Sequence, residues 1–225
     1  MNGQDERVLR VTRSKEVARQ SYDRLSRWYD MLAASSEWKY TQLGLQMLAA
    51  QEGERILELG FGTGNALLEL GRDVGSSGLI SGIDISEGML NIASEKLETA
   101  GLSEHVKLDC GDGAALPYDV SEFDAVFMSF TLELFDTPEI PVVLGECLRV
   151  LKPNGRMVVV AMVKKERDNL AVRLYEWAHA KLPNYVDCRP IMLRRDLQRS
   201  GFNLQKVSER MMWGLPLEIA LAHVA

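Results

Sequence analysis

Three glycines at alternate positions follow a short apolar run in the segment Arg55-Ile56-Leu57-Glu58-Leu59-Gly60-Phe61-Gly62-Thr63-Gly64. Such a run is typical of a buried strand, and the glycines let the turn after it press its backbone against a ligand. Residues 65–70 then have the pattern of a helix, whose first free N–H groups favour an anionic group beside them. The segment predicts a ligand-binding corner between a strand and a helix.

The spacing of the glycines excludes two common phosphate-binding loops. The dinucleotide fingerprint needs Gly-x-Gly-x-x-Gly, but its last glycine would fall on Asn65 or on Leu67. A Walker loop ends in Gly-Lys-Ser/Thr, whereas Gly64 is followed by Asn65 and Ala66. For the glycines alone, an ordinary strand–turn–helix corner without a ligand is the alternative.

Two further acidic residues lie where strands are expected to end. Asp84 closes an apolar segment, and a carboxylate at that place can accept hydrogen bonds from both hydroxyls of a ribose. Asp84 or Ser86 can instead cap the helix that follows, and the two roles are compatible. Asp112 ends a third segment and is followed by Gly113, so a solvated turn is the alternative there.

The chain alternates between strand-like and helix-like segments. Strands are expected near 54–59, 79–83, 105–109, 123–129 and 156–162, with helices near 64–74, 86–100 and 138–151. Sequential strand–helix–strand units imply a parallel sheet with helices on both faces. Ligands of such sheets bind beyond the carboxyl ends of the strands, so the residues that follow the strands should converge on one rim. These residues are Glu58, Gly60, Asp84, Asp112 and Ser129.

The flanks of this core have patterns of their own. Residues about 13–50 predict two or three helices, and residues 169–181 predict another. Pro183 and Pro190 punctuate a loop. A short helix over 191–200 and a closing pair of strands over 202–212 and 215–224 complete the expected order.

The glycine loop, Asp84, Asp112 and the turn Leu151-Lys152-Pro153-Asn154-Gly155-Arg156 occur in the order found in class I S-adenosylmethionine (SAM) methyltransferases. The chain resembles this family over residues 50–165. The turn is structural, because Pro153 is expected to stop a helix and Asn154-Gly155 to lead the chain into a buried strand. The resemblance implies an α/β, Rossmann-like fold: a seven-stranded, mostly parallel sheet with helices on both faces, its last strand antiparallel, and an N-terminal helical lid.

The resemblance also implies SAM as the cofactor, S-adenosylhomocysteine as its product, and a set of contact positions. In the family, an acidic residue at the position of Asp112 accepts a hydrogen bond from the adenine amino group. The backbone N–H of the residue after it, here Gly113, donates to a ring nitrogen of the adenine. An N-terminal tyrosine closes over SAM in relatives, which indicates Tyr29. The expected cofactor-binding set is Glu58, Gly60, Gly62, Thr63, Gly64, Asp84, Ile85, Met89, Asp112, Gly113, Ser129 and Tyr29.

Within the family, the chain resembles the ubiquinone/menaquinone C-methyltransferases of the type 11 group. The shared features are Tyr29-Asp30, Trp38-Lys39, Gly62-Thr63-Gly64 and Ser129-Phe130. The chain departs from that pattern at Phe61 and at Asp187-Cys188-Arg189-Pro190. These departures weaken the prediction of a quinone acceptor and do not affect the prediction that the chain is a methyltransferase.

Methyl transfer is an in-line displacement at a sulfonium carbon, so the protein must align the acceptor and exclude water. An amine acceptor can use its lone pair, whereas a phenol or enol carbon needs a base or an acidified substrate. His179 and Tyr22 are the candidates for a catalytic role. Tyr22 and Tyr29 would lie on one face of a helix, and core packing is the alternative for both. Arg189 and the arginines at 194, 195 and 199 can bind an acidic acceptor, although a solvated helix face is the simpler interpretation.

The expected function is transfer of the SAM methyl group to a small-molecule or lipid-like acceptor. An N-methyltransferase for a phospholipid head group or a small amine shares this core, and a non-catalytic SAM-binding regulatory module is an alternative of another class. Methylation of base nitrogens is disfavoured, because Ser129-Phe130-Thr131-Leu132 stands where those enzymes have Asn/Asp-Pro-Pro-Tyr. The acceptor and the oligomeric state stay open at this point.

The composition limits the class of protein. With 225 residues and 46% hydrophobic residues, the chain can form one domain: a helical lid or cap (1–50), a SAM-binding core (51–165), and acceptor-side helices with closing strands (166–225). A net charge of −6 argues against a nucleic-acid partner. The three cysteines lack metal-ligand spacing, so we expect reduced thiols, no metal and a cytoplasmic location. A polar N-terminus and short apolar runs predict neither signal peptide nor membrane span.

Overall fold

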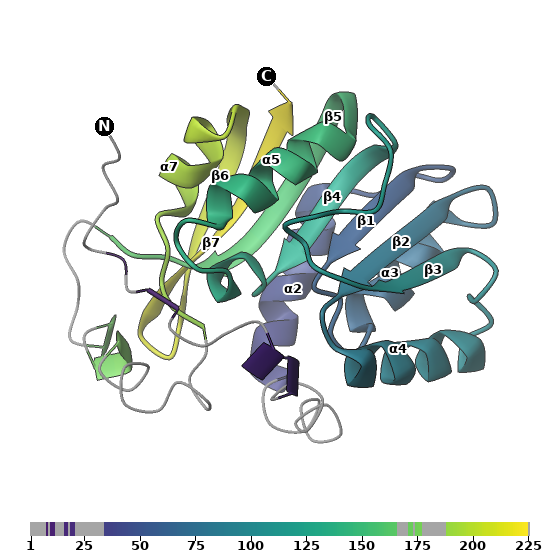
Figure 1. The fold of residues 1–225 in the computed structure, drawn as a ribbon, viewed down its shortest axis with the longest axis horizontal. Coiled ribbons are helices and arrows are strands. Elements are labelled where there is room, and N and C mark those ends of the chain that lie inside the picture. The colour runs from purple at the N-terminus through teal and green to yellow at the C-terminus, as the bar shows by residue number, and fades with distance from the viewer. Residues whose placement is uncertain are drawn as a thin grey trace.

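The structure is a computed structural model that describes residues 8, 10–11, 16–17, 19–20, 34–165, 171–172, 174–176 and 188–224. Within these residues, seven strands form one sheet in the order β3-β2-β1-β4-β5-β7-β6 (Figure 1). The strands are β1 (Arg55–Leu59), β2 (Leu79–Asp84), β3 (Val106–Cys110), β4 (Phe123–Ser129), β5 (Leu151–Met162), β6 (Phe202–Met212) and β7 (Leu215–Val224).

Strands β1 to β5 are parallel, and β7 lies antiparallel between β5 and β6. The expected seven-stranded, mostly parallel sheet with an antiparallel last strand is therefore confirmed. β6 is an outer strand that pairs with β7, and a register shift interrupts this pairing between Leu204 and Lys206. Because β5 and β6 are both antiparallel to β7, the turn after β6 emerges at the carboxyl edge of the parallel strands.

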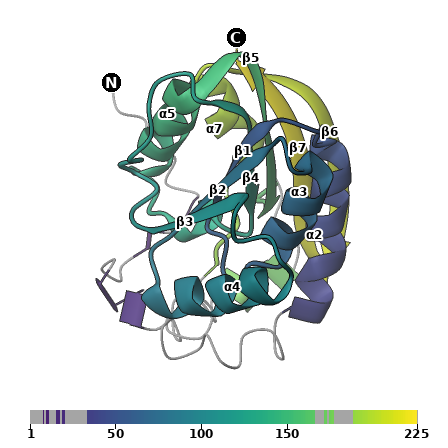
Figure 2. The same ribbon diagram turned by 90° about the vertical axis from the view of Figure 1, so that its right-hand side faces the viewer.

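Helices cover both faces of the sheet (Figure 2). One face carries α2 (Ala34–Leu48), α3 (Asn65–Val74) and α4 (Glu87–Thr99), and the other carries α5 (Ile140–Val150) and α7 (Leu193–Arg199). Strand residues alternate between the two cores. In β5, for example, Val158 and Val160 pack toward α2, whereas Met157 and Val159 pack toward α5, and all four are buried. Burial of both faces explains the near-continuous apolar runs of these strands.

The element boundaries differ from expectation mainly around Pro153. We expected Pro153 to stop the helix, but α5 already ends at Val150, and Leu151 is extended and pairs with Phe123 of β4. β5 therefore begins at Leu151 and contains the proline turn as an irregularity before pairing resumes at Arg156. Pro153 disfavours helical backbone only at Lys152, the residue before it, so the earlier end of α5 follows from the pairing of Leu151 with Phe123.

The described residues contain no helix that is long and apolar enough to cross a membrane. A short 3-10 helix, η1 (Leu132–Leu134), follows β4. Of the cysteines, Cys147 is buried, Cys188 is half-buried and Cys110 is exposed, and no disulfide joins any of the three. The closing helix expected over 191–200 is α7, and the described residues 171–172 and 174–176 of the preceding segment are helical.

Candidate functional site

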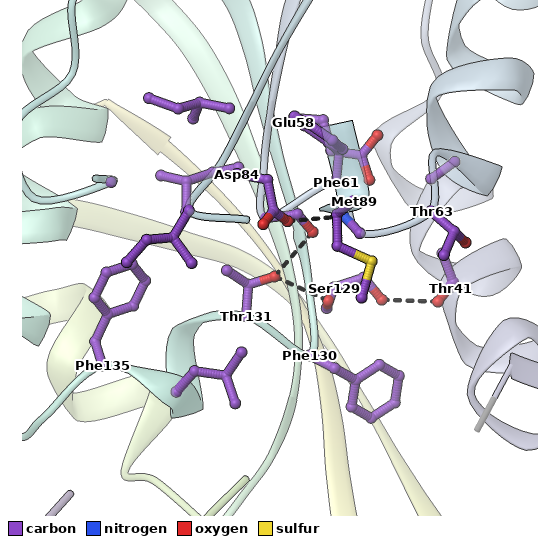
Figure 3. A pocket seen from close by; sticks show the side chains of 18 of the residues that line it. Thr41, Glu58, Phe61, Thr63, Asp84, Met89, Ser129, Phe130, Thr131 and Phe135 are labelled. Carbon is purple, nitrogen blue, oxygen red and sulfur yellow. Dashed lines mark hydrogen bonds between the residues drawn. The ribbon is translucent and has the colours of Figure 1, made fainter. Parts of the chain in front are cut away.

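A pocket of about 220 Å³ opens at the carboxyl ends of the parallel strands (Figure 3). Its walls come from α2, the β1–α3 loop, the end of β2, the loop after β3 and the segment after β4. Ten expected positions line it: Glu58, Gly60, Gly62, Thr63, Asp84, Ile85, Met89, Asp112, Gly113 and Ser129. The strand ends thus converge on one rim, as the sheet topology requires.

The β1–α3 loop closes one wall of the pocket. A Cβ at Gly60 would lie 2.3 Å from Cγ2 of Thr131, so the close approach of these two segments requires glycine. A Cβ at Gly62 would meet nothing within 4 Å, although its φ of +52° disfavours other residues. Gly64 is not among the lining residues and instead lets α3 approach α4, because its Cβ would lie 2.8 Å from Cβ of Ala93. Of the three glycines of this loop, Gly62 is therefore the one that faces open space.

Asp84 ends β2 and holds the glycine loop in place. Its Oδ2 accepts a hydrogen bond from the N–H of Gly62 at 2.9 Å, and its Oδ1 accepts one from the N–H of Ser86 at 3.0 Å. Ser86 caps α4, since its Oγ accepts from the N–H of Met89 at 3.1 Å. Capping and pocket lining thus belong to different side chains, because Ser86 supplies the cap and Asp84 faces the pocket.

The loop after β3 brings Asp112 and Gly113 to the pocket. Oδ1 of Asp112 accepts a hydrogen bond from the N–H of Ala114 at 2.9 Å, so this half-buried aspartate stabilises a turn and also lines the pocket. A Cβ at Gly113 would lie 3.0 Å from the side chains of Leu59 and Phe135. The turn and this tight packing together fix the position of the backbone at the wall.

A chain of hydroxyl groups joins three walls of the pocket, as the dashed lines of Figure 3 show. Oγ of Ser129 lies 2.8 Å from Oγ1 of Thr41 in α2. Oγ1 of Thr131 donates to the carbonyl of Ser129 at 3.0 Å and approaches that of Gly60 at 3.4 Å. Between them, Phe130 has a φ of +53°, which is an unfavourable conformation for a bulky residue. The end of β4, the glycine loop and α2 are thereby tied together.

Glu58 is the most deeply buried charge of the pocket. Its side chain is 3% exposed, and its Oε2 has no hydrogen-bond partner among the described residues. Burial, and after it the Asp84 carboxylate, hold the pKa of Glu58 well above its ordinary value. A buried carboxylate without a partner is unfavourable, and a cationic group of a ligand would relieve that cost.

Every ionisable residue that lines the described pocket is acidic: Glu37, Glu58, Asp84, Asp112, Asp136 and Glu139. Asp136 is paired with Arg10, whose Nη2 lies 2.6 Å from its Oδ2. Walls of this charge attract a cation and repel the phosphates of a nucleotide. SAM carries a sulfonium and an ammonium against a single carboxylate, so the residues present fit SAM and disfavour a dinucleotide.

Several lining residues lay outside the sequence-based expectation. Helix α2 contributes Glu37, Trp38 and Thr41, the segment after β4 contributes Phe130, Thr131, Leu134, Phe135, Asp136 and Glu139, and Val11 adds to the wall. α2 precedes the core in the chain, so its place over the sheet depends on tertiary packing. One available signal was the glycine inside this helix, because a Cβ at Gly44 would lie 2.6 Å from Cγ2 of Val160.

The remaining expectations have different outcomes. Tyr22, Tyr29 and His179 lie outside the described residues and stay predictions. The solvated face expected for Arg189 is wrong, because this side chain is 1% exposed and its Nη2 donates to the carbonyl of Phe135 at 2.6 Å. Burial lowers the pKa of Arg189. This arginine therefore supports the pocket wall from behind.

Comparison with known proteins agrees with this geometry. A family profile described as a methyltransferase domain matches residues 56–155. A demethylmenaquinone methyltransferase of Lactococcus lactis is 33% identical over 89% of this chain and 74% of the relative. One of Symbiobacterium thermophilum is 28% identical over 67% of this chain, and the match spans 61% of that relative. A ubiquinone/menaquinone biosynthesis C-methyltransferase of Vibrio cholerae is 29% identical over 76% of this chain and 64% of the relative.

Solved structures show the same fold. The [4+2]-cyclase SpnF has a TM-score of 0.76 at 20% identity, covering 96% of this chain and 98% of that one. A SAM-dependent methyltransferase from Aquifex aeolicus has a TM-score of 0.62 at 23% identity, covering 82% of this chain and 89% of that one. Together with the pocket and the Lactococcus relative, these matches show that the chain belongs to the class I SAM-dependent methyltransferase family.

Proposed function

We propose that this methyltransferase binds SAM in the rim pocket and transfers the methyl group to a small, lipid-like acceptor. The observation that carries the proposal is the acidic wall around the buried Glu58, whose Oε2 has no partner among the described residues. In this proposal Glu58 faces the cationic part of the cofactor, Asp84 accepts from the ribose hydroxyls, and Asp112 with Gly113 receives the adenine. When bound, SAM supplies an electrophilic methyl group for in-line displacement.

The acceptor would lie against the apolar wall formed by α2 and the segment after β4. This wall contains Trp38, Phe130, Leu134 and Phe135. Aromatic and aliphatic side chains favour an apolar acceptor and exclude water from the reacting carbon. The names of the Lactococcus and Vibrio relatives, which refer to quinones, support an acceptor of the lipid-like class.

Carboxylates are the titratable groups available in the described pocket if the acceptor must lose a proton. Among these carboxylates, Glu37 directly precedes Trp38 of the proposed acceptor wall, and both residues line the pocket from α2. We therefore assign the role of proton acceptor in C-methylation to Glu37. A carboxylate suits the proton of an acidified enol or phenol, since the pKa values of base and substrate are then close.

The same acidic walls favour a second candidate acceptor, a small amine or an amine head group. An ammonium ion would be attracted to the six carboxylates and could stack on Trp38. After losing its proton, an amine reacts through its lone pair and needs no further base. Turnover with matched panels of phenolic, enolic and amine acceptors, measured as S-adenosylhomocysteine released, separates the two candidates.

A pair of glycine variants tests the cofactor site. Gly62 and Gly101 both have positive φ, +52° and +69°, and a Cβ at either would meet nothing within 4 Å. Gly62→Ala and Gly101→Ala should therefore destabilise the fold similarly, by about 1–2 kcal/mol. Calorimetry should show loss of SAM and S-adenosylhomocysteine binding in Gly62→Ala and unchanged affinity in Gly101→Ala. Equal affinities in the two variants would show that SAM does not lie against this loop.

A further inference from the structure

The turn between β6 and β7 carries an exposed tryptophan on unfavourable backbone. Two residues, Trp213 and Gly214, connect the paired ends of the strands, and their φ angles are +51° and +82°. Hairpin turns with two positive φ angles favour Asn-Gly, and a bulky first residue is disfavoured there. Trp213 is 68% exposed, so neither turn geometry nor core packing accounts for this residue.

Trp213 belongs to a group of exposed apolar residues that we call the hairpin tip: Met211 and Trp213 at the turn, and Leu174 on the helical segment beside it. Met211 is 53% exposed and Leu174 is 64% exposed. The helical segment that carries Leu174 packs against the turn, because a Cβ at Gly214 would lie 3.2 Å from Cβ of Ala171. Met211 and Trp213 are thus exposed at one turn, and Leu174 is exposed on the segment that packs on this turn; exposed apolar side chains gathered in this way are characteristic of interaction sites.

The hairpin tip lies at the edge of the sheet where the pocket opens, beyond the ends of β4 and β5 (Figure 1). A hydrogen bond joins the two sites, since the hydroxyl of Tyr40 in α2 donates to the carbonyl of Met211 at 2.7 Å. The same helix lines the pocket with Trp38 and Thr41. A partner surface that contacts the hairpin tip would therefore lie beside the apolar wall that we propose for the acceptor.

Two exposed cations flank the hairpin tip. Arg210 directly precedes Met211, and Lys39 is next to the tyrosine of α2 that bonds the tip. Neither cation is paired with a carboxylate in the part of the chain that the structure describes, while Glu209 is neutralised by Lys165 and Arg194. Exposed apolar side chains with unpaired cations at their border are complementary to an anionic lipid surface, and tryptophan favours the membrane interface.

We propose that the hairpin tip docks the enzyme on an anionic lipid surface, with Trp213 at the level of the head groups and Lys39 and Arg210 against lipid phosphates. A lipid-like acceptor would then pass from the bilayer to the pocket without crossing water. The purpose of this docking rests on the proposed lipid-like acceptor, whereas lipid binding itself is measurable with no acceptor present.

The test is co-sedimentation of the full chain with vesicles of phosphatidylcholine, with and without phosphatidylglycerol. Wild type should bind the vesicles that contain phosphatidylglycerol. Trp213→Asn should bind them at least about tenfold more weakly, since it removes the inserted side chain. Its Tm should stay the same or rise, because asparagine suits the turn. Arg210→Gln should weaken binding about fivefold. Val120→Ser, at a 68% exposed site in the turn before β4 on the opposite edge, is the matched control and should bind like wild type.

Two results would overturn the docking proposal: absence of wild-type binding to either vesicle, and equal binding by wild type and Trp213→Asn. In the first case, concentration-dependent self-association that Trp213→Asn abolishes would assign the hairpin tip to contact with a second copy of this chain. Calorimetry with SAM on the same samples keeps the two proposals apart. Retained SAM binding with failed vesicle binding rejects the docking surface alone, whereas absence of SAM binding in the folded wild type rejects the cofactor site.

Discussion

Replacement of Glu58 by glutamine should weaken SAM binding and change its dependence on pH. Glutamine keeps the size of the side chain and removes its charge. Glu58 is 3% exposed, and its Oε2 has no partner among the described residues, so a cationic ligand would supply its main interaction. A hydrogen bond to a charged group contributes about 1.5–3 kcal/mol, so the dissociation constant should rise about 10- to 150-fold.

The pH dependence follows from the pKa of Glu58, which burial and the Asp84 carboxylate raise well above its ordinary value of 4.5. At a pH below this raised pKa, the free enzyme holds a proton that a cationic ligand must displace. Wild-type affinity should therefore increase with pH, by at most about tenfold per pH unit, until the carboxyl is ionised. Proton release on binding should accompany this increase. The Glu58→Gln enzyme should lack both effects.

Titration calorimetry from pH 5 to 9, in two buffers of different ionisation enthalpy, measures the affinity and the released protons together. The amino group of SAM titrates in both enzymes, so the difference between the two profiles belongs to Glu58. Parallel profiles for wild type and Glu58→Gln, with equal proton release, would refute the assignment of Glu58 to the cationic part of the ligand.

Three further variants test other parts of the molecule. Asp84→Ala should weaken SAM binding by about 1–3 kcal/mol and also lower Tm, because the N–H groups of Gly62 and Ser86 lose their acceptor; an unchanged dissociation constant would leave Asp84 with a structural role alone. Gly60→Ala should lower Tm more than Gly62→Ala, since its Cβ would meet Thr131 at 2.3 Å, and equal thermal unfolding would contradict this packing. Burial raises the pKa of Glu133 from 4.5 to about 8, so wild-type stability should fall as pH rises between these values, by at most about 1.4 kcal/mol per unit. Glu133→Gln should remove that fall in urea unfolding at pH 6 and 9, and parallel losses in both proteins would reject it.

The sheet core was predictable because each strand carries its own local signal. Apolar runs that end in Glu58, Asp84 or Ser129 identify strands, and parallel topology places their ends on one rim. The boundary at Leu151 was missed, because its pairing with Phe123 is a contact between distant residues that no local pattern encodes.

The acceptor side of the pocket was less predictable, because it is built by segments that only tertiary packing brings together. Thr41 meets Ser129 across 88 positions of the chain, and neither residue shows this in its neighbourhood. Arg189 looked like part of a polar helix, but it lies before α7 and is covered on folding. Charge alone did not distinguish this buried arginine from the exposed ones beside it.

The outer strand β6 also bears on how the protein behaves at high concentration. A strand of 11 residues at a sheet border presents backbone groups to which another molecule can add a strand. Here the register shift beside Lys206 bends the ladder, and Lys206, Glu209 and Arg210 place charge along it. Charge and irregularity on a border strand oppose intermolecular sheet extension. Variants in which Lys206, Glu209 and Arg210 are replaced by uncharged residues should aggregate at temperatures below their Tm. Solubility and thermal stability would then depend on different residues of this molecule.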